Sequence, residues 1–119
     1  MLYSVMLVTR LRRRVFNGGA VRQYTSDVLR EASGYSHTHI HLIDYGEDCV
    51  FFEIESDPSQ LDPCISSLRS FSSGRIRQRF PEFHSMPSFW MKKYFAKPGP
   101  SDDDFRSEAL SFLHTLPTR

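Results

Sequence analysis

The sequence predicts a ferredoxin-like α+β sandwich of order β-α-β-β-α-β, followed by an added C-terminal helix. Three observations predict this fold class. The 119 residues are enough for one hydrophobic core. Four short segments are rich in strand-forming residues, and three longer ones carry apolar residues at helical spacing. We therefore expect residues 1–119 to form a single domain with two helices on one face of an antiparallel sheet. The other face would be left for a ligand, a partner or the added helix.

The four predicted strands are residues 2–9, 37–44, 48–55 and 89–97. In the third of these, alternation places Val50 and Phe52 on one face and Cys49 and Phe51 on the other. The short link at 45–47 predicts a hairpin between the second and third strands.

Helix signals separate these strands. The first helix should begin near Ala20 and end at Gly34, and the second is opened by residues 57–59 and should stop before Pro81. Ser101 is the expected N-cap of the last helix. Its buried stripe is predicted to contain Phe105, Ala109, Phe112, Leu113 and Leu116.

Composition excludes several classes of protein. No apolar run approaches the roughly 20 residues that cross a membrane, and no signal-peptide pattern is present, so we expect a cytoplasmic protein without a membrane partner. Two cysteines do not make a disulfide framework. The net charge of +1 hides alternating blocks, since residues 10–30 and 64–97 are basic while 31–63 contain eight acids and no Lys or Arg. Such blocks suit either an anion-binding face or ordinary solvated surfaces.

Four segments carry the pattern of a known family in the same order. They are YSVMLVTRLRRRVF (3–16), LRSFSSGRIRQRFPEF (68–83), FWMKKYFAK (89–97) and SDDDFRSEALSFL (101–113). Together they resemble the single-tyrosine HUH transposases over nearly the whole chain. In that family a His-hydrophobe-His pair and a polar residue, usually Gln, hold a divalent metal, and a tyrosine on the last helix attacks phosphorus.

The resemblance places these catalytic positions on residues of other types. The two histidine positions fall on Cys49 and Phe51, the tyrosine position on Ala109 and the glutamine position on Leu113. The resemblance therefore implies a catalytically inactive, transposase-like protein that needs no cofactor. It also implies a homodimer that binds single-stranded or hairpin DNA or RNA in a regulatory or accessory role.

Ten cations form the candidate nucleic-acid-binding set, because the corresponding basic turn and second helix contact hairpin DNA in the family. They are Arg10, Arg12, Arg13, Arg14, Arg69, Arg75, Arg77, Arg79, Lys92 and Lys93. Nearby Phe and Tyr residues could stack on unpaired bases.

Two other functions stay open. The acidic middle of the chain favours a protein-interaction module that has lost nucleic-acid binding. Alternation also places His37, His39 and His41 on the face that carries Cys49 and Glu53, which would suit an enzyme with a rebuilt metal site.

Tyr94 is a conceivable substitute nucleophile. A packed or stacking aromatic is the favoured interpretation of this residue, because the family has aromatic residues at the same strand position.

Overall fold

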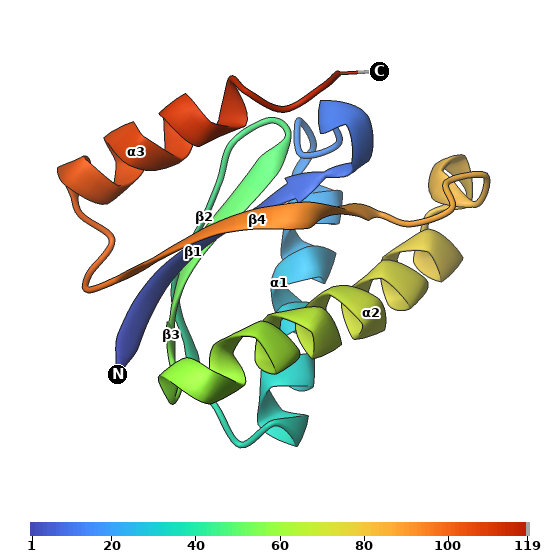
Figure 1. Cartoon of the computed structure of the whole chain (residues 1–119). Coiled ribbons are helices and arrows are strands. Elements are labelled where there is room, and N and C mark those ends of the chain that lie inside the picture. The colour runs from blue at the N-terminus through green and yellow to red at the C-terminus, as the bar shows by residue number, and fades with distance from the viewer. Residues whose placement is uncertain (119) are drawn as a thin grey trace.

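The computed structural model describes residues 1–118 and has the predicted order of elements (Figure 1). Its strands are β1 (Leu2–Thr9), β2 (Ile40–Tyr45), β3 (Cys49–Glu55) and β4 (Trp90–Pro98). Its α-helices are α1 (Gly19–Tyr35), α2 (Leu61–Arg79) and α3 (Asp103–Leu113). Three short 3-10 turns connect them: η1 (Arg10–Arg12), η2 (Pro58–Gln60) and η3 (Pro81–Phe83). The strands form one antiparallel sheet in the order β2-β3-β1-β4, so the predicted fold class is confirmed.

The sheet lies between two helical layers (Figure 1). Helices α1 and α2 cover one face, where Val50 and Phe52 join the main core, and α3 covers the other, where Cys49 and Phe51 are buried. The predicted alternation in β3 is therefore confirmed. The added helix, rather than a ligand, occupies the second face, and this explains why six of the seven residues of β3 are buried.

The structure corrects the predicted strand 37–44. Strand β2 begins only at Ile40, and His37 has a left-handed φ of 55° in the turn that ends α1, where its amide donates to Gly34 O. A register shift between His41 and Asp44 further breaks the alternation, and Leu42 within it has φ 52°. The prediction that three histidines share one strand face is wrong, because alternation holds only in regular strand.

Two predicted helix ends also differ. Gly34 lies inside α1, which continues through Tyr35. Asp102, not Ser101, caps α3, and its Oδ1 accepts a 2.9 Å hydrogen bond from Phe105 N. The amide of Ser101 instead donates to Glu53 Oε2 at 2.7 Å, because buried Glu53 on β3 needs a donor.

Candidate nucleic-acid interface

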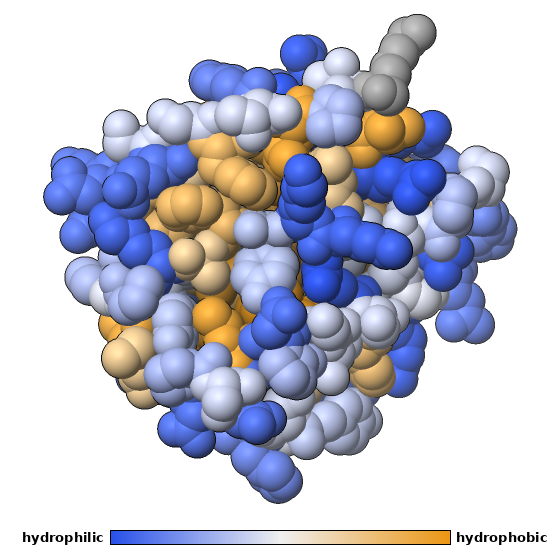
Figure 2. Space-filling model, in the orientation of Figure 1, coloured by the Kyte–Doolittle hydropathy of each residue, from blue (hydrophilic) through white to orange (hydrophobic). Residues whose placement is uncertain are grey.

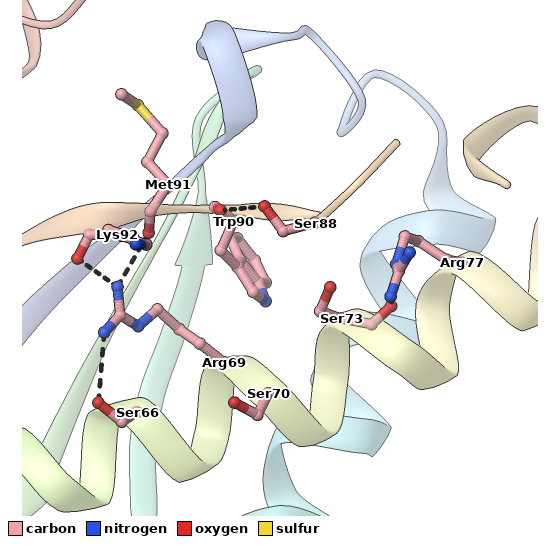
Figure 3. A pocket seen from close by; sticks show the side chains of 9 residues that line it. All are labelled: Ser66, Arg69, Ser70, Ser73, Arg77, Ser88, Trp90, Met91 and Lys92. Carbon is pink, nitrogen blue, oxygen red and sulfur yellow. Dashed lines mark hydrogen bonds between the residues drawn. The ribbon is translucent and has the colours of Figure 1, made fainter. Parts of the chain in front are cut away.

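A pocket of about 400 Å³ opens between α2 and the start of β4 (Figure 3). We call it the α2–β4 pocket. Its lining residues come from one side of α2 and from the chain entering β4: Ser66, Arg69, Ser70, Ser73, Arg77, Ser88, Trp90, Met91 and Lys92. The residues on α2 recur at spacings of three and four, which places them on one face of a helix. The neighbouring face, with Leu68 and Ile76, is buried in the core.

Two serines of α2 fasten the opposite wall of the pocket. Ser72 Oγ accepts a 2.8 Å hydrogen bond from Trp90 Nε1, and Ser73 Oγ accepts one of 2.9 Å from Phe89 N. Trp90 is thereby fixed as a buried wall of the pocket. Its polar indole N–H is satisfied, as a buried tryptophan requires.

Two predicted nucleic-acid-binding arginines hold the main chain of the same wall. Arg69 Nη1 donates to the carbonyls of Met91, at 3.0 Å, and Lys92, and Arg77 Nη1 donates to Met86 O at 2.8 Å (Figure 3 shows the Arg69 bonds). Each guanidinium bonds through some of its N–H groups and still lines the pocket. These side chains therefore position the wall and also contribute positive charge to the pocket.

A bulge in β4 explains why Arg69 can reach two successive carbonyls. Leu7 of β1 lies opposite Tyr94 and Thr9 lies opposite Trp90, so β4 carries two more residues than β1 over this stretch. The extra residues interrupt the hydrogen-bond ladder between β1 and β4 and change the direction of the local side chains. Lys92 and Lys93 lie within the bulge and are exposed.

A second, smaller pocket of about 230 Å³ lies beside the first and extends toward η1. It is lined by Arg10, Leu11 and four residues that also line the α2–β4 pocket: Ser88, Trp90, Met91 and Lys92. We call the two pockets together the basic groove. Its cations are Arg10, Arg69, Arg77 and Lys92, and no Asp or Glu of the described chain lines either pocket.

The basic turn after β1 is held in an unusual backbone conformation. Leu11 and Arg12 both have φ 55°, in the left-handed region. The Nε of Arg12 pairs with Asp48 Oδ2 at 3.0 Å, and both side chains are largely buried. Arg13 is exposed, whereas Arg14 forms a 3.4 Å ion pair with Glu47 at the surface. Arg12 thus stabilises the turn that presents its neighbours.

The other two predicted cations lie away from the basic groove, on the flank of α2 that faces α1. Arg75 pairs with Glu31 at 3.6 Å, and Arg79 lies over the ring of Tyr24 at 5.9 Å. The ten predicted cations therefore do not form one continuous surface.

Tyr94 is held as a packing residue. Its hydroxyl donates to Asp62, and the guanidinium of Arg69 lies 5.3 Å from the ring centroid. Partial burial, together with the hydrogen bond and charge of Asp62, raises the pKa of Tyr94 to about 12. The phenol therefore stays protonated near neutral pH.

The four positions that the resemblance links to catalysis lie together where α3 packs on the sheet. Cys49, Phe51, Ala109 and Leu113 are all buried in one apolar cluster. Desolvation, and then the charge of Asp48, raises the pKa of Cys49 to about 12, which is unfavourable for a metal-binding thiolate. The four residues are thus surrounded by a packed apolar core.

The structure does not assemble the predicted histidine site. The rings of His39 and His41 lie 6.2 Å apart and are exposed, and His37 is outside the strand. Within residues 1–118, no three His, Cys, Asp or Glu side chains come together in a metal-binding arrangement.

Sequence analysis missed several residues of this region. The serines of the α2–β4 pocket were not singled out, although Ser66, Ser70 and Ser73 share a helical face with Arg69 and Arg77. That spacing was the available signal. No local signal identified Arg106, whose guanidinium lies 3.9 Å from the ring centroid of Phe51 and pairs with Asp44 at 3.0 Å.

The fold and its layers define an α+β sandwich of the ferredoxin-like type with an added C-terminal helix. The family model described as transposase, IS200 like, matches residues 1–103, and the chain belongs to this family. A comparison with curated proteins gave no match. In the described part of the chain, no helix is long and apolar enough to span a membrane.

Two solved structures share the fold. A crystal structure at 1.90 Å of a candidate transposase from Deinococcus radiodurans R1 has a TM-score of 0.85 and 17% identity, and the match covers all of this chain and 92% of the other. A REP-associated tyrosine transposase bound to a REP hairpin has a TM-score of 0.61 and 6% identity. That match covers 91% of this chain but only 61% of the other.

Proposed function

We propose that this chain binds structured single-stranded DNA or RNA through the basic groove and does not cleave it. The observation that carries the proposal is the groove itself, which combines four cations with an aromatic wall and has no Asp or Glu of residues 1–118 in its lining. Backbone phosphates are attracted by such a surface. The relative that is bound to a REP hairpin supports the choice of a hairpin as the first probe.

The proposal of an inactive protein is supported by packing. Ala109 and Leu113 point into the apolar cluster with Cys49 and Phe51, where a metal or an attacking group would have to displace core side chains. A role in regulation, such as competing for hairpin ends, would follow from binding without cleavage.

Gel-shift titration tests binding. We expect a DNA or RNA hairpin to bind more tightly than a duplex of the same length, and Arg10→Ala with Lys92→Ala to weaken binding. Arg75→Ala with Arg79→Ala removes the same charge from the far flank of α2 and should weaken binding less. If no hairpin binds at about 50 mM salt, where electrostatic binding is strong, the proposal fails and a protein-interaction role takes its place.

A denaturing gel tests the inactive state. With Mg²⁺ or Mn²⁺ present, single-stranded DNA should show neither nicking nor a covalent protein adduct. An adduct that Tyr94→Phe abolishes would overturn this part of the proposal, because it would show that Tyr94 of β4 acts as the nucleophile.

We further propose a homodimer. Strand β4 is an edge of the sheet, and apolar surface is visible between it and α3 (Figure 2). The half-buried Met91, Phe95 and Phe112 lie at the border of the α3 cluster. Analytical ultracentrifugation should give twice the 13.9 kDa of one chain, and a monomer at all concentrations would contradict it.

A further inference from the structure

The α2–β4 pocket has the volume of a small-molecule site. Its volume of about 400 Å³ lies within the range of ligand pockets. Trp90 supplies an apolar side, and the serines of α2 supply hydroxyl groups along the other (Figure 3).

Hydrogen-bond donors in the pocket remain available to a ligand. The bonds that Arg77 makes within the described chain use its Nε and Nη1, which leaves Nη2. Lys92 is exposed and forms no ion pair within residues 1–118. Ser70 is exposed one helical turn from Ser66, on the same side of α2.

The charge of the pocket indicates which anion it suits. Arg69, Arg77 and Lys92 line the pocket with three positive charges, and no carboxylate of the described chain lines it. A phosphodiester within a strand carries one negative charge, whereas a phosphate monoester carries about −1.5 to −2 at pH 7 and offers three acceptor oxygens. Guanidinium groups and hydroxyls are suited to these oxygens.

We propose that the α2–β4 pocket binds a phosphate monoester, either the terminal phosphate of a nucleic-acid strand or that of a free mononucleotide. The phosphate would lie beside Lys92 and Ser70, with the sugar and base toward Trp90. This deepens the proposed function, since a strand end in the pocket would place the adjoining nucleotides along the basic groove.

Trp90 provides a site-specific signal, because it is the only tryptophan of the chain and forms a wall of the pocket. Titration with adenosine 5′-monophosphate should change its fluorescence saturably, whereas adenosine should not. Inorganic phosphate should compete. Lys92→Ala and Ser70→Ala should each weaken the binding of the monophosphate, the former about tenfold because a charge-assisted bond is lost. Lys97→Ala removes the same charge from β4 outside the pocket, where Lys97 pairs with Glu108, and should retain wild-type affinity.

A second titration separates the two sources of the phosphate. Two hairpins of identical sequence, one with a 5′-phosphate and one with a 5′-hydroxyl, are compared by fluorescence anisotropy. Tighter binding of the phosphorylated hairpin, lost in Lys92→Ala, assigns the pocket to strand ends. A response to the monophosphate with no hairpin binding assigns the pocket to free mononucleotides. The proposed function then fails, while the pocket proposal stands. If both hairpins bind equally and the monophosphate gives no response, the pocket proposal is overturned and the proposed function stands.

Discussion

Arg12 and Arg13 are neighbours in the basic turn, but their surroundings differ. The guanidinium of Arg12 pairs with Asp48, and the main chain of the turn is held by Thr9 Oγ1, which donates to Arg13 O at 2.7 Å. Arg13 has an exposed side chain. One arginine therefore stabilises the left-handed turn, and the next is available to a ligand.

This difference predicts that alanine substitutions at Arg12 and Arg13 affect different properties. Arg12→Ala leaves the largely buried Asp48 without its charged partner and should lower the free energy of unfolding by about 1–2 kcal/mol. Arg13→Ala should change it by less than about 0.5 kcal/mol, as surface substitutions do, while weakening hairpin binding. Urea denaturation followed by Trp90 fluorescence measures both. Equal losses of stability would contradict the assignment of Arg12.

The two cysteines should react with iodoacetamide at different rates. Burial and the charge of Asp48 raise the pKa of Cys49 to about 12, so roughly one thiol in 10,000 is ionised at pH 8. Cys64 also has a raised pKa, but it lines a surface pocket near the start of α2. We expect Cys64 to be modified first. The rate at Cys49 should still rise with pH above 9, where an ordinary thiol has levelled off. Mass spectrometry of the native protein measures both sites, with the unfolded protein as control, and fast labelling of Cys49 at pH 8 would contradict the prediction.

At the scale of elements, α3 is attached to the sheet by packing and by polar contacts along its length. Phe105, Ala109 and Leu113 fill the apolar cluster. The chain entering the helix is held by the bond from Ser101 N to Glu53, and Lys97 pairs with Glu108 at 2.7 Å. The helix is therefore docked on its own sheet as a structural element.

Two substitutions on this helix test its docking. Leu113→Asp places an unpaired charge in the cluster and should lower the free energy of unfolding by roughly 2–4 kcal/mol. Leu110→Asp is the matched control, because Leu110 is 45% exposed on the same helix, and its effect should stay within about 0.5 kcal/mol. Thermal melts compare the two variants. An unchanged midpoint for Leu113→Asp would show that this side of α3 is presented to solvent.

Across the whole molecule, the acidic and basic blocks of the sequence neutralise each other in part. Acids of the middle segment pair with cations from distant segments: Glu31 with Arg75, Asp44 with Arg106, Glu47 with Arg14, Asp48 with Arg12 and Glu55 with the N-terminus. Five of the eight acids of the middle segment are thus paired within the described chain. The groove between α2 and β4 is left as a cationic region.

The salt dependence of hairpin binding should report this arrangement. Neutralising about four phosphates predicts a slope near −3 for log K against log[salt] on single strands. Arg10→Ala with Lys92→Ala should flatten the slope by about 1.4, because each lost phosphate contact contributes roughly 0.7. Affinity measured at several salt concentrations gives the slope. A wild-type slope close to zero would show that binding, if present, does not depend on the cations of the groove.

The sequence by itself determined the order of elements and the faces of β3. These features depend on alternation and helical spacing, which are local properties of successive residues. It also placed Ala109 and Leu113 on the buried stripe of the last helix, which the structure confirms.

Only the tertiary structure decided which polar groups meet. Arg12 and Asp48 are 36 residues apart, and Glu53 and Ser101 are 48 apart. The spacing of neighbouring residues does not indicate such pairs. The family resemblance therefore assigned Arg12 to a binding surface, and residue propensity assigned the cap of α3 to Ser101. The bulge in β4 is likewise a property of pairing between two strands. The fold could therefore be predicted because burial follows local periodicity, whereas the groove depends on contacts that form only when distant segments pack together.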